Sequence, residues 1–552
     1  MPKYASSAEG IRQFFHSNEF TKCRKYGILI RRHGNRRMKV KKLFRILFSR
    51  ITIVSLLILF QLQLILISAF RFTDYFVYYY LFATLLSLLL TLRIVSRKDA
   101  AEYKIAWMAT VLLIPVFGGM LYLIFSGNKL SVRKKKKMAR INESMKNTLS
   151  GDPCRDETLF AGDTSAAFQS RYITSCAFSP PFDNTEVKYF ALGDSLFPTM
   201  LQELKKAKKY IYLEYFIIEE GRMWNSILDV LERKAKEGVD VRIIYDDMGT
   251  IMLLPGDYSQ KLRAKGIRCH VFNRFVPVLS GHLNNRNHRK IGIIDGKVAF
   301  TGGINLADEY INEKERFGHW KDNAVMLRGD AAWSLTVMFL TMWDYLEEAG
   351  GAAVSYEHYR PDNYGQPHPE ASGIVQPYTD SPLDSEAVGE TIYLNMIHRA
   401  KRYVYITTPY LIIDELMENA LCTAAKCGID VRIITPGIGD KKIVFETTKS
   451  YYENLIRNGV KIYEYTPGFL HAKTFLCDDE YATVGTVNLD FRSLYLHFEC
   501  GVWMYRCRAI AEIKQDFLET LEKSAPVREE DCHPNLIRRL FRAVMALLSP
   551  MM

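Results

Sequence analysis

The chain contains 552 residues, of which 48% are hydrophobic, 24% charged and 12% aromatic. This balance excludes a disordered or fibrous protein, and the length corresponds to about three to four domain-sized units. The net charge of +12 is uneven, because residues 1–150 contain 27 Lys and Arg against 6 Asp and Glu, whereas the remaining residues carry a net charge of −9. The basic N-terminal region weakens a nucleic-acid-binding interpretation of the whole chain and favours contact with an anionic membrane surface.

Two apolar runs near the N-terminus predict membrane-spanning helices. Residues 51–70 contain no charged side chain and reach the ~20 residues that a bilayer core requires. Residues 76–92 form a second run with aromatic residues at one end, as is typical of a membrane interface. A third run, residues 106–125, contains Pro115 and two adjacent glycines, which favour a bend. A helical hairpin in the core of a soluble protein is the alternative for the first two runs.

The distribution of basic residues predicts how these segments are oriented. Fourteen Lys and Arg precede the first run, and the sequence RKKKK follows the third run at residues 133–137. Positively charged flanks stay in the cytoplasm, so two spans leave both ends inside, whereas a third full span would move the rest of the chain outside. We therefore expect residues 106–125 to form a re-entrant or interfacial element. Ten scattered cysteines without a CxxC pair agree with a reducing compartment for the remainder.

Beyond residue 180 the sequence predicts α/β structure in two copies. An amphipathic helix at 193–208 precedes an apolar strand at 210–218, and helices and strands then alternate in the same order in both halves. The segment EGVDVRIIYD at 237–246 matches CGIDVRIITP at 427–436. We therefore expect two pseudo-symmetric α/β domains of about 180 residues, packed face to face, with sheets covered on both faces.

Each copy contains the same pattern of polar residues. A His is followed by a Lys two residues later, an Asp at seven, a Gly at fourteen and an Asn at seventeen, and every position recurs after 183 residues. One such pattern would be weak evidence, but two copies with identical spacing predict a functional site. The catalytic candidates are His288, Lys290, Asp295, His471, Lys473 and Asp478. The phosphate-binding candidates are Gly302, Gly303, Asn305, Gly485, Thr486 and Asn488.

The spacing also predicts how these residues act. His288 and Lys290 share one face of a strand, as do His471 and Lys473, because residues i and i+2 point the same way. If the two copies meet across a pseudo-twofold axis, two imidazoles and two ammonium groups converge on a cavity that suits a phosphate. Glycine N–H groups and the Asn side chains would add hydrogen bonds. One His would attack phosphorus and the other would protonate the leaving alkoxide, so we expect no metal and no other cofactor.

Each His needs a hydrogen-bond partner that fixes its tautomer. Glu499 lies in a predicted strand, HFECGVWMY, 28 residues after His471. Asp322 occupies the corresponding place in the first copy, in the segment KDNAVMLRG. We expect these two carboxylates to orient the histidines, and surface carboxylates are the alternative interpretation.

These residues resemble the phospholipase D superfamily, whose HxKxxxxD signature occurs twice per active unit. RNHRKIGIIDGK, GGINLADEY and FLHAKTFLCDDEYATVGTVNLDFRSL are similar to segments of bacterial cardiolipin synthases, and the resemblance covers about residues 95–552. It implies two phospholipase D-like domains with mixed sheets flanked by helices, preceded by a helical membrane anchor. It further implies that His288 is the nucleophile and His471 the general acid and base. His497 departs from the family, which typically has Asn there, and this puts local details of the second-copy pocket in doubt.

The implied reaction transfers a phosphatidyl group between two phosphatidylglycerol molecules through a phosphohistidine, giving cardiolipin and glycerol. An enzyme acting on head groups must lie at the membrane, so we expect phosphatidylglycerol and anionic membrane lipid as partners. Lys134–Lys137 either bind this lipid or serve only as a topology signal. LIRRLFRAVMALL at 536–548 predicts a basic amphipathic helix that either touches the membrane or packs on the soluble part.

Two other functions compete with phosphatidyl transfer. The same fold could hydrolyse a phospholipid or a nucleic acid, although the net charge of −9 beyond residue 150 disfavours nucleic acid. A non-enzymatic membrane scaffold would have no need of paired His and Lys residues. We therefore expect no nucleic-acid partner, and whether the chain forms a homo-oligomer is left open.

The sequence predicts six regions in a multi-pass protein of the plasma membrane, with the catalytic domains on the cytoplasmic side. The two phospholipase D-like domains follow the membrane region and are separated by a linker. The regions are a basic extension (1–45), a membrane region (46–128), a basic linker (129–180), a first domain (181–350), a linker (351–380) and a second domain with the C-terminal amphipathic helix (381–552).

Overall fold

The chain forms two units. One consists of Met1–Arg97 with Trp107–Leu123, and the other of Lys98–Ala106 with Ile124–Met552. The second unit contains both α/β copies. The computed structural model describes residues 59, 60, 63, 67 and 73–551, except for 98–99, 127–131, 151–158, 161, 275–284, 348–354 and 385.

Helix α3 (Thr73–Val95) is the main described element of the N-terminal unit. Its segment Val77–Val95 is the one helix among the described residues that is long and apolar enough to cross a membrane. Its large apolar side chains are mostly exposed, which suits a helix surrounded by lipid. The predicted run 76–92 lies within α3, whereas the predicted run 51–70 falls outside the described residues apart from four single positions.

The third apolar run forms two short helices. Helix α4 (Ala101–Leu113) ends before Pro115, and α5 (Phe117–Phe125) begins after it. Gly118 lies so close to α4 that a Cβ atom would come within 2.3 Å of the carbonyl oxygen of Thr110. Neither helix alone reaches the ~20 residues that a full span requires.

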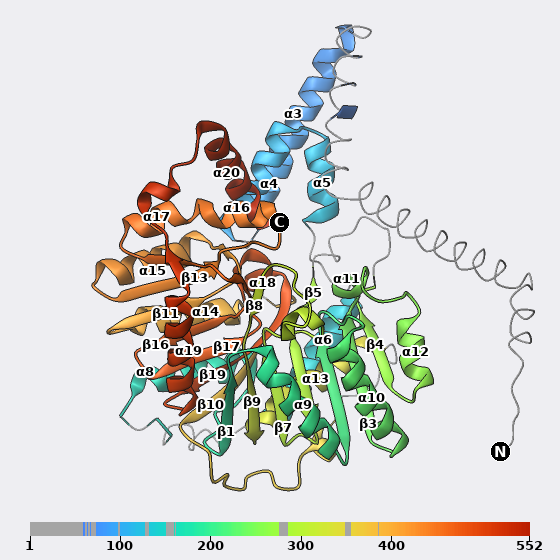
Figure 1. Ribbon diagram of the computed structural model, residues 1–552. Coiled ribbons are helices and arrows are strands. Elements are labelled where there is room, and N and C mark those ends of the chain that lie inside the picture. The colour runs from blue at the N-terminus through green and yellow to red at the C-terminus, as the bar shows by residue number, and fades with distance from the viewer. Residues whose placement is uncertain are drawn as a thin grey trace, which may run out of the picture. The chain divides into compact units, whose positions relative to one another are not determined.

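The first α/β copy is a seven-stranded mixed sheet flanked by helices (Figure 1). Its order is β1-β9-β7-β6-β2-β3-β4, in which β2, β3 and β4 run parallel and the other neighbours pair antiparallel. The strands are β1 (Thr185–Phe190), β2 (Tyr210–Tyr215), β3 (Asp240–Asp246), β4 (Arg268–Phe272), β6 (Lys290–Ile294), β7 (Val298–Gly302) and β9 (Ala324–Gly329). The helices are α9 (Gly193–Lys206), α10 (Arg222–Lys236), α11 (Asp247–Thr250), α12 (Tyr258–Ala264) and α13 (Ala331–Leu346).

The second copy repeats this topology. Its order is β10-β19-β17-β16-β11-β13-β14, and β20 (Ser524–Pro526) extends the edge next to β14. The matched segments EGVDVRIIYD and CGIDVRIITP form β3 and β13, which hold equivalent places in the two sheets. The strands are β10 (Ile374–Asp380), β11 (Tyr403–Thr407), β13 (Asp430–Pro436), β14 (Lys461–Tyr465), β16 (Thr474–Cys477), β17 (Tyr481–Gly485) and β19 (His497–Tyr505). The helices are α14 (Val388–Arg399), α15 (Glu415–Lys426), α16 (Lys442–Ser450), α17 (Tyr452–Arg457), α18 (Phe491–Tyr495), α19 (Ala509–Glu522) and α20 (Leu536–Leu548).

Each copy contributes a short strand to the other. β5 (Arg286–Asn287) of the first copy pairs with β19 of the second, and β15 (Gly468–Leu470) of the second pairs with β8 (His319–Lys321) of the first. A further pair, β12 (Leu411–Ile412) with β18 (Leu489–Asp490), lies within the second copy. Buried apolar residues of both sheets form one shared core, so the two copies are packed as a single body.

The segments around the two copies are more structured than a linker. Residues 129–180 contain α6 (Val132–Leu149), which packs on α13, and α8 (Thr164–Ala177), which packs on α14. β10, within the predicted linker 351–380, is the edge strand of the second sheet and the counterpart of β1. Both segments are expected from the sequence to be linkers, whereas the packing of α6 and α8 on helices of the two copies and the pairing of β10 with β19 give them regular structure.

Candidate active site

The two His-Lys pairs lie at equivalent edges of the two sheets. Lys290 begins β6 and pairs with Tyr215, the last residue of β2. In the second copy Lys473 directly precedes β16, whose first residue pairs with Thr407 at the end of β11. The His and Lys side chains are all buried, with each His 7% exposed. The antiparallel return strand of each sheet therefore carries its His-Lys pair to the carboxyl end of the parallel strands.

The backbone of each His is held by the opposite copy. The N–H of His288 donates to the carbonyl oxygen of Phe498 at 2.9 Å, and the N–H of His471 donates to that of Lys321 at 2.7 Å. These bonds continue the crossed strand pairs β5–β19 and β15–β8. The electrostatic neighbours of His288 include Lys290, Lys473 and His471. The structure therefore brings both His-Lys pairs into one site, as their spacing predicts.

Both predicted carboxylates contact a histidine, and each contact crosses between the copies. Glu499 of the second copy accepts from Nδ1 of His288, with both carboxylate oxygens at 3.0 Å. Asp322 of the first copy accepts from Nδ1 of His471 at 2.6 Å. Both carboxylates are fully buried. A carboxylate on Nδ1 places the hydrogen there and leaves the Nε2 lone pair of each ring free for chemistry.

Burial and clustered positive charge keep both imidazoles neutral. Burial lowers the pKa of His288 well below its usual value, and Lys290 and Lys473 lower it further. Burial and Lys473 lower the pKa of His471 to about 4, although Asp322 opposes this shift. A neutral imidazole is the form that can attack phosphorus or accept a proton.

The two lysines are desolvated cations directed at the same region. Burial lowers the pKa of Lys290 to about 8 and that of Lys473 to about 7, against the opposing effect of nearby carboxylates. Lys290 Nζ donates to the carbonyl oxygen of His288 at 2.6 Å, and Lys473 Nζ donates to that of His471. An anion would restore full charge to both ammonium groups, which suits them to bind a phosphate.

Two of the predicted phosphate-binding positions have their N–H groups engaged by neighbouring strands. The N–H of Gly303 donates to Asn323 and that of Thr486 donates to Cys500, so these groups are engaged within the sheets rather than facing a ligand. A Cβ on Gly303 would lie 2.0 Å from the Asp322 carboxylate, and one on Gly302 would lie 2.4 Å from the Asn323 carbonyl oxygen. A Cβ on Gly485 would meet the backbone of β19. These residues leave space for the carboxylates and neighbouring strands.

The two Asn side chains are largely engaged within their own copies. Asn305 accepts from the N–H of Ile217 at 2.9 Å and donates to the Tyr310 hydroxyl at 2.7 Å. Asn488 donates to Ser493 Oγ at 3.0 Å, while its Oδ1 has no hydrogen-bond partner within the described residues. The predicted phosphate contact remains a prediction for both Asn residues, and Asn305 also links the segment after β2 to the segment after β7.

The two Asp residues of the motif lie at the opposite end of the strand from the site. Asp295 accepts hydrogen bonds from the N–H groups of residues 208–210 at 2.7–2.9 Å. Asp478 accepts from those of residues 401–403 at 2.6–2.9 Å. Catalytic carboxylates would be expected beside the histidines, but the structure does not bring Asp295 and Asp478 there. Each instead holds the start of a neighbouring strand by these hydrogen bonds.

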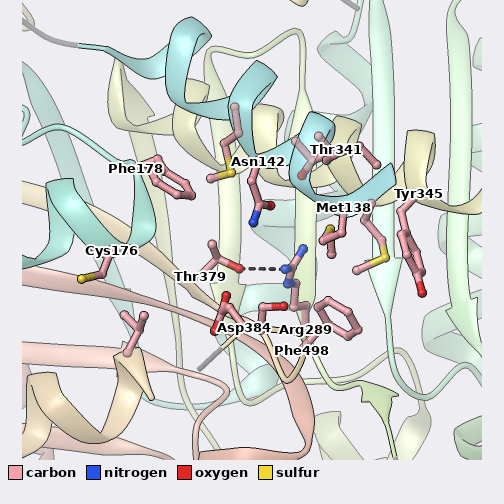
Figure 2. A pocket seen from close by; sticks show the side chains of 15 residues that line it. Met138, Asn142, Cys176, Phe178, Arg289, Thr341, Tyr345, Thr379, Asp384 and Phe498 are labelled. Atoms are coloured by element: carbon pink, nitrogen blue, oxygen red, sulfur yellow. Dashed lines mark hydrogen bonds between the residues drawn. The ribbon is translucent and has the colours of Figure 1, made fainter. Parts of the chain in front are cut away.

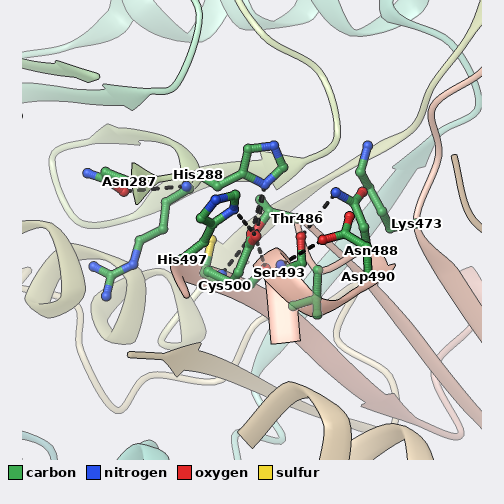
Figure 3. Close-up of polar contacts among 12 residues, drawn as sticks. Asn287, His288, Lys473, Thr486, Asn488, Asp490, Ser493, His497 and Cys500 are labelled. Atoms are coloured by element: carbon green, nitrogen blue, oxygen red, sulfur yellow. Dashed lines mark hydrogen bonds and ion pairs between the residues drawn. The ribbon is translucent and has the colours of Figure 1, made fainter. Parts of the chain in front are cut away.

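A third histidine lies beside His288. The rings of His288 and His497 have centroids 5.6 Å apart, and Figure 3 shows them close together, with Lys473 further away. Nδ1 of His497 is 3.6 Å from Glu499, and neither ring nitrogen has a hydrogen-bond partner in the described part of the chain. Burial lowers the pKa of His497 to about 4. Among the described residues, His288, His497 and Glu499 are close enough to share a metal ion.

Aromatic rings that the motif spacing did not reveal line both histidines. Phe216 lies edge-on to His288, with ring centroids 5.1 Å apart. Tyr310 and Trp320 lie against His471 at 5.7 and 5.6 Å. These residues come from loops and short elements outside the repeated pattern, so no periodicity marks them. They exclude water from the rings and contribute to their low pKa values.

A separate cavity lies behind the site, on the side to which Arg289 points (Figure 2). Methionines of α6 and α13 line it, and Arg289 donates to Thr379 there at 2.7 Å. Its volume is about 40 Å³, which admits a few water molecules and excludes a lipid chain. The residues that line this cavity do not include either His-Lys pair.

Comparison with known proteins identifies the family. The chain matches "Cardiolipin synthase, PLD-like domain" at residues 200–334 and 393–521, and "Phospholipase_D-nuclease N-terminal" at residues 85–127. It is 35% identical to "Cardiolipin synthase 2" of Bacillus anthracis over 81% of this chain and 86% of that protein. The chain belongs to the cardiolipin synthase family. The predicted phospholipase D membership, and with it the enzyme class of phosphatidyltransferase, is confirmed.

Further relatives agree with this family and with the fold. A Streptococcus mutans protein described as "Uncharacterized protein" is 44% identical over 81% of this chain and 96% of its own length. The crystal structure of phosphatidylserine synthase from Haemophilus influenzae is similar with a TM-score of 0.51 at 13% identity, covering 66% of this chain and 95% of that chain. At this identity the likeness supports the fold alone, and the predicted pair of mixed α/β sheets is confirmed.

Proposed function

We propose that this member of the cardiolipin synthase family transfers a phosphatidyl group from one phosphatidylglycerol to a second, giving cardiolipin and glycerol. The observation that carries the proposal is the crossed arrangement of two His-carboxylate pairs with two buried lysines in one site. Two imidazoles with free Nε2 atoms can act on the attacking and leaving sides of one phosphorus.

In the first step, Nε2 of His288 attacks phosphorus, because Glu499 already occupies its Nδ1. The bond from nitrogen to phosphorus forms while the bond from phosphorus to the glycerol oxygen breaks. Lys290 and Lys473 neutralise the two non-bridging oxygens. The phosphodiester anion raises the pKa of His471, which donates its Nε2 proton to the departing glycerol oxygen.

In the second step, a hydroxyl of the next phosphatidylglycerol attacks the phosphohistidine. His471 removes the hydroxyl proton as the bond from oxygen to phosphorus forms and His288 departs as a neutral imidazole. Asp322, 2.6 Å from Nδ1 of His471, stabilises the imidazolium that results. The aromatic rings beside both histidines support the transfer over hydrolysis, because they limit the access of water.

We further propose that both catalytic domains face the cytoplasm, with two spans at 51–70 and 76–92 and an interfacial element at 106–125. The supporting features are the apolar helix Val77–Val95, the break between α4 and α5, and the basic residues on both sides of this region. This topology would place the site at the leaflet that holds anionic phosphatidylglycerol.

The test incubates the purified full-length protein in vesicles with phosphatidylglycerol labelled in its acyl chains, and separates the lipid products. We expect labelled cardiolipin and one glycerol per cardiolipin formed. Phosphatidic acid without cardiolipin would instead assign the site to a phospholipid hydrolase, the alternative that the same residues allow.

A further inference from the structure

The C-terminal helix α20 (Leu536–Leu548) turns its apolar side away from the protein. Leu536 and Ile537 are each 82% exposed and Leu540 is 66% exposed, whereas Arg542 is only 7% exposed. The apolar face of α20 consists of Leu536, Ile537, Leu540, Phe541, Val544 and Leu547. An amphipathic helix on a soluble protein ordinarily buries its apolar face, so this face is open to a partner beyond the residues that the structure describes.

The inverted orientation is fixed by specific polar contacts. Glu446 of α16 accepts from Nε of Arg538 at 2.9 Å and from Nε of Arg542 at 3.2 Å. The hydroxyl of Tyr451 lies 3.3 Å from Ser549 Oγ at the end of the helix. The arginines therefore face α16, and the apolar face is left on the outer side.

The same surface leads to the rim of the active site. The loop before α16 runs beside β15, where the N–H of Ile438 lies 3.4 Å from the carbonyl oxygen of Gly468, three residues before His471. Lys441 of this loop is exposed, and its charge contributes to the low pKa of His288. Ile438 in this loop and Ile443 in α16 add exposed apolar side chains, 44% and 40% exposed.

We propose that the apolar face of α20 inserts into the interface of an anionic phospholipid bilayer and holds the rim of the active site at the lipid head groups. The partner is a bilayer rather than protein because the helix contains no acidic residue and carries the exposed Arg539, which is not one of the two arginines held by Glu446, beside its apolar residues. Its 13 residues are too few to span a bilayer, so it lies in the plane of the interface. The proposal rests on phospholipids being the substrates.

The direct test is fluorescence quenching of full-length protein in vesicles that contain phosphatidylglycerol with brominated acyl chains. Leu540→Trp should give a blue-shifted emission that brominated lipid quenches at least twofold beyond the quenching of the parent protein. Gln515 is an exposed residue of α19, so Gln515→Trp is the matched control and should show no added quenching. Emission of Leu540→Trp that stays solvent-like and unquenched would overturn the proposal.

The second test replaces Leu540 and Val544 by Glu and compares two forms of substrate. We expect cardiolipin formation in vesicles to fall about tenfold or more, with activity on dispersed short-chain phosphatidylglycerol unchanged within twofold. Bilayer docking would be overturned by an equal loss on both substrates or by no loss in vesicles. It would also be overturned by a change in particle mass without a vesicle-specific loss, which would indicate that the helix binds a second copy of the chain. If the parent protein makes no cardiolipin, the proposed function fails, whereas quenching still decides docking.

Discussion

The two halves of the active site share one geometry but differ in how the carboxylate is held. Asp322 is short and makes a single contact of 2.6 Å to His471, in space that Gly303 leaves open. Glu499 is one methylene longer, contacts His288 with both oxygens at 3.0 Å, and also accepts from the Thr486 hydroxyl. The two copies thus keep a carboxylate at the same position but differ in the length of its side chain and in the residues that it contacts.

This difference agrees with the different tasks proposed for the two histidines. A single short contact to Asp322 raises the proton affinity of His471, which suits a group that gains and returns a proton. Glu499 is shared among His288, Thr486 and the nearby His497, so its charge is spread over several partners. That arrangement positions the His288 ring while leaving it a neutral nucleophile.

The largest effects should come from removing the histidines themselves. We expect His288→Ala and His471→Ala each to lower turnover by about 10⁴-fold or more, because each removes a group that acts on the reacting bonds. Only His288→Ala should abolish the covalent adduct with labelled lipid phosphate, measured after acid-free quenching. An adduct that survives in His288→Ala and disappears in His471→Ala would exchange the two roles.

Replacing each carboxylate by its neutral amide should affect the two halves of the site to different extents. Asp322→Asn should lower kcat by about 10³-fold and Glu499→Gln by about 10²-fold, since only His471 depends on a single short contact for its charged form. His471 must carry a proton to release glycerol, and Asp322 raises the pKa of His471, so the loss of Asp322 should move the alkaline limb of the kcat/KM profile for the donor lipid to lower pH. Equal losses of kcat in the two variants, with no shift of that limb, would show that the two carboxylates have the same role.

The positions beside the carboxylates provide a matched pair. Gly303→Ala would place a methyl group 2.0 Å from the Asp322 carboxylate, so we expect the carboxylate to move and kcat to fall about 10- to 100-fold. Thr486→Ala removes one hydroxyl from Glu499 and should cost about threefold to tenfold. Steady-state kinetics on vesicles, with thermal unfolding as the control, would measure both, and a harmless Gly303→Ala would contradict the steric explanation.

Much of the site follows from the sequence, because the repeated spacing fixes which residues share a strand face. His288, Lys290 and their counterparts at 471 and 473 are brought together as predicted, and the equivalent places of Asp322 and Glu499 in the two repeats mark the carboxylates. The crossed pairing was not predictable, since it depends on β5 and β15 joining the opposite copy. The separation of Asp295 from the site could have been inferred from strand geometry. Five residues along a strand from Lys290 cover about 16 Å, which is too far for Asp295 to share the site of Lys290.

The motif Asp residues should therefore affect stability more than chemistry. Asp295→Asn and Asp478→Asn each weaken contacts to three backbone N–H groups, and we expect each to lower the free energy of unfolding by about 2 kcal/mol with kcat within threefold of the parent. Chemical denaturation followed by fluorescence, together with kcat below the transition, tests both. A large fall in kcat without destabilisation would return these residues to a catalytic role.

The smallest effect should come from His497, whose place beside the catalytic histidine is taken by Trp320 in the first half. Neither of its ring nitrogens has a hydrogen-bond partner within the described residues, and Glu499 already holds His288 by two contacts. His497→Asn should therefore change kcat/KM by less than about threefold, because no hydrogen bond of the ring is lost. The same variant should remove any inhibition by micromolar Zn²⁺ that depends on His288, His497 and Glu499 together. A fall of tenfold or more in the absence of metal would mean that His497 contacts the substrate.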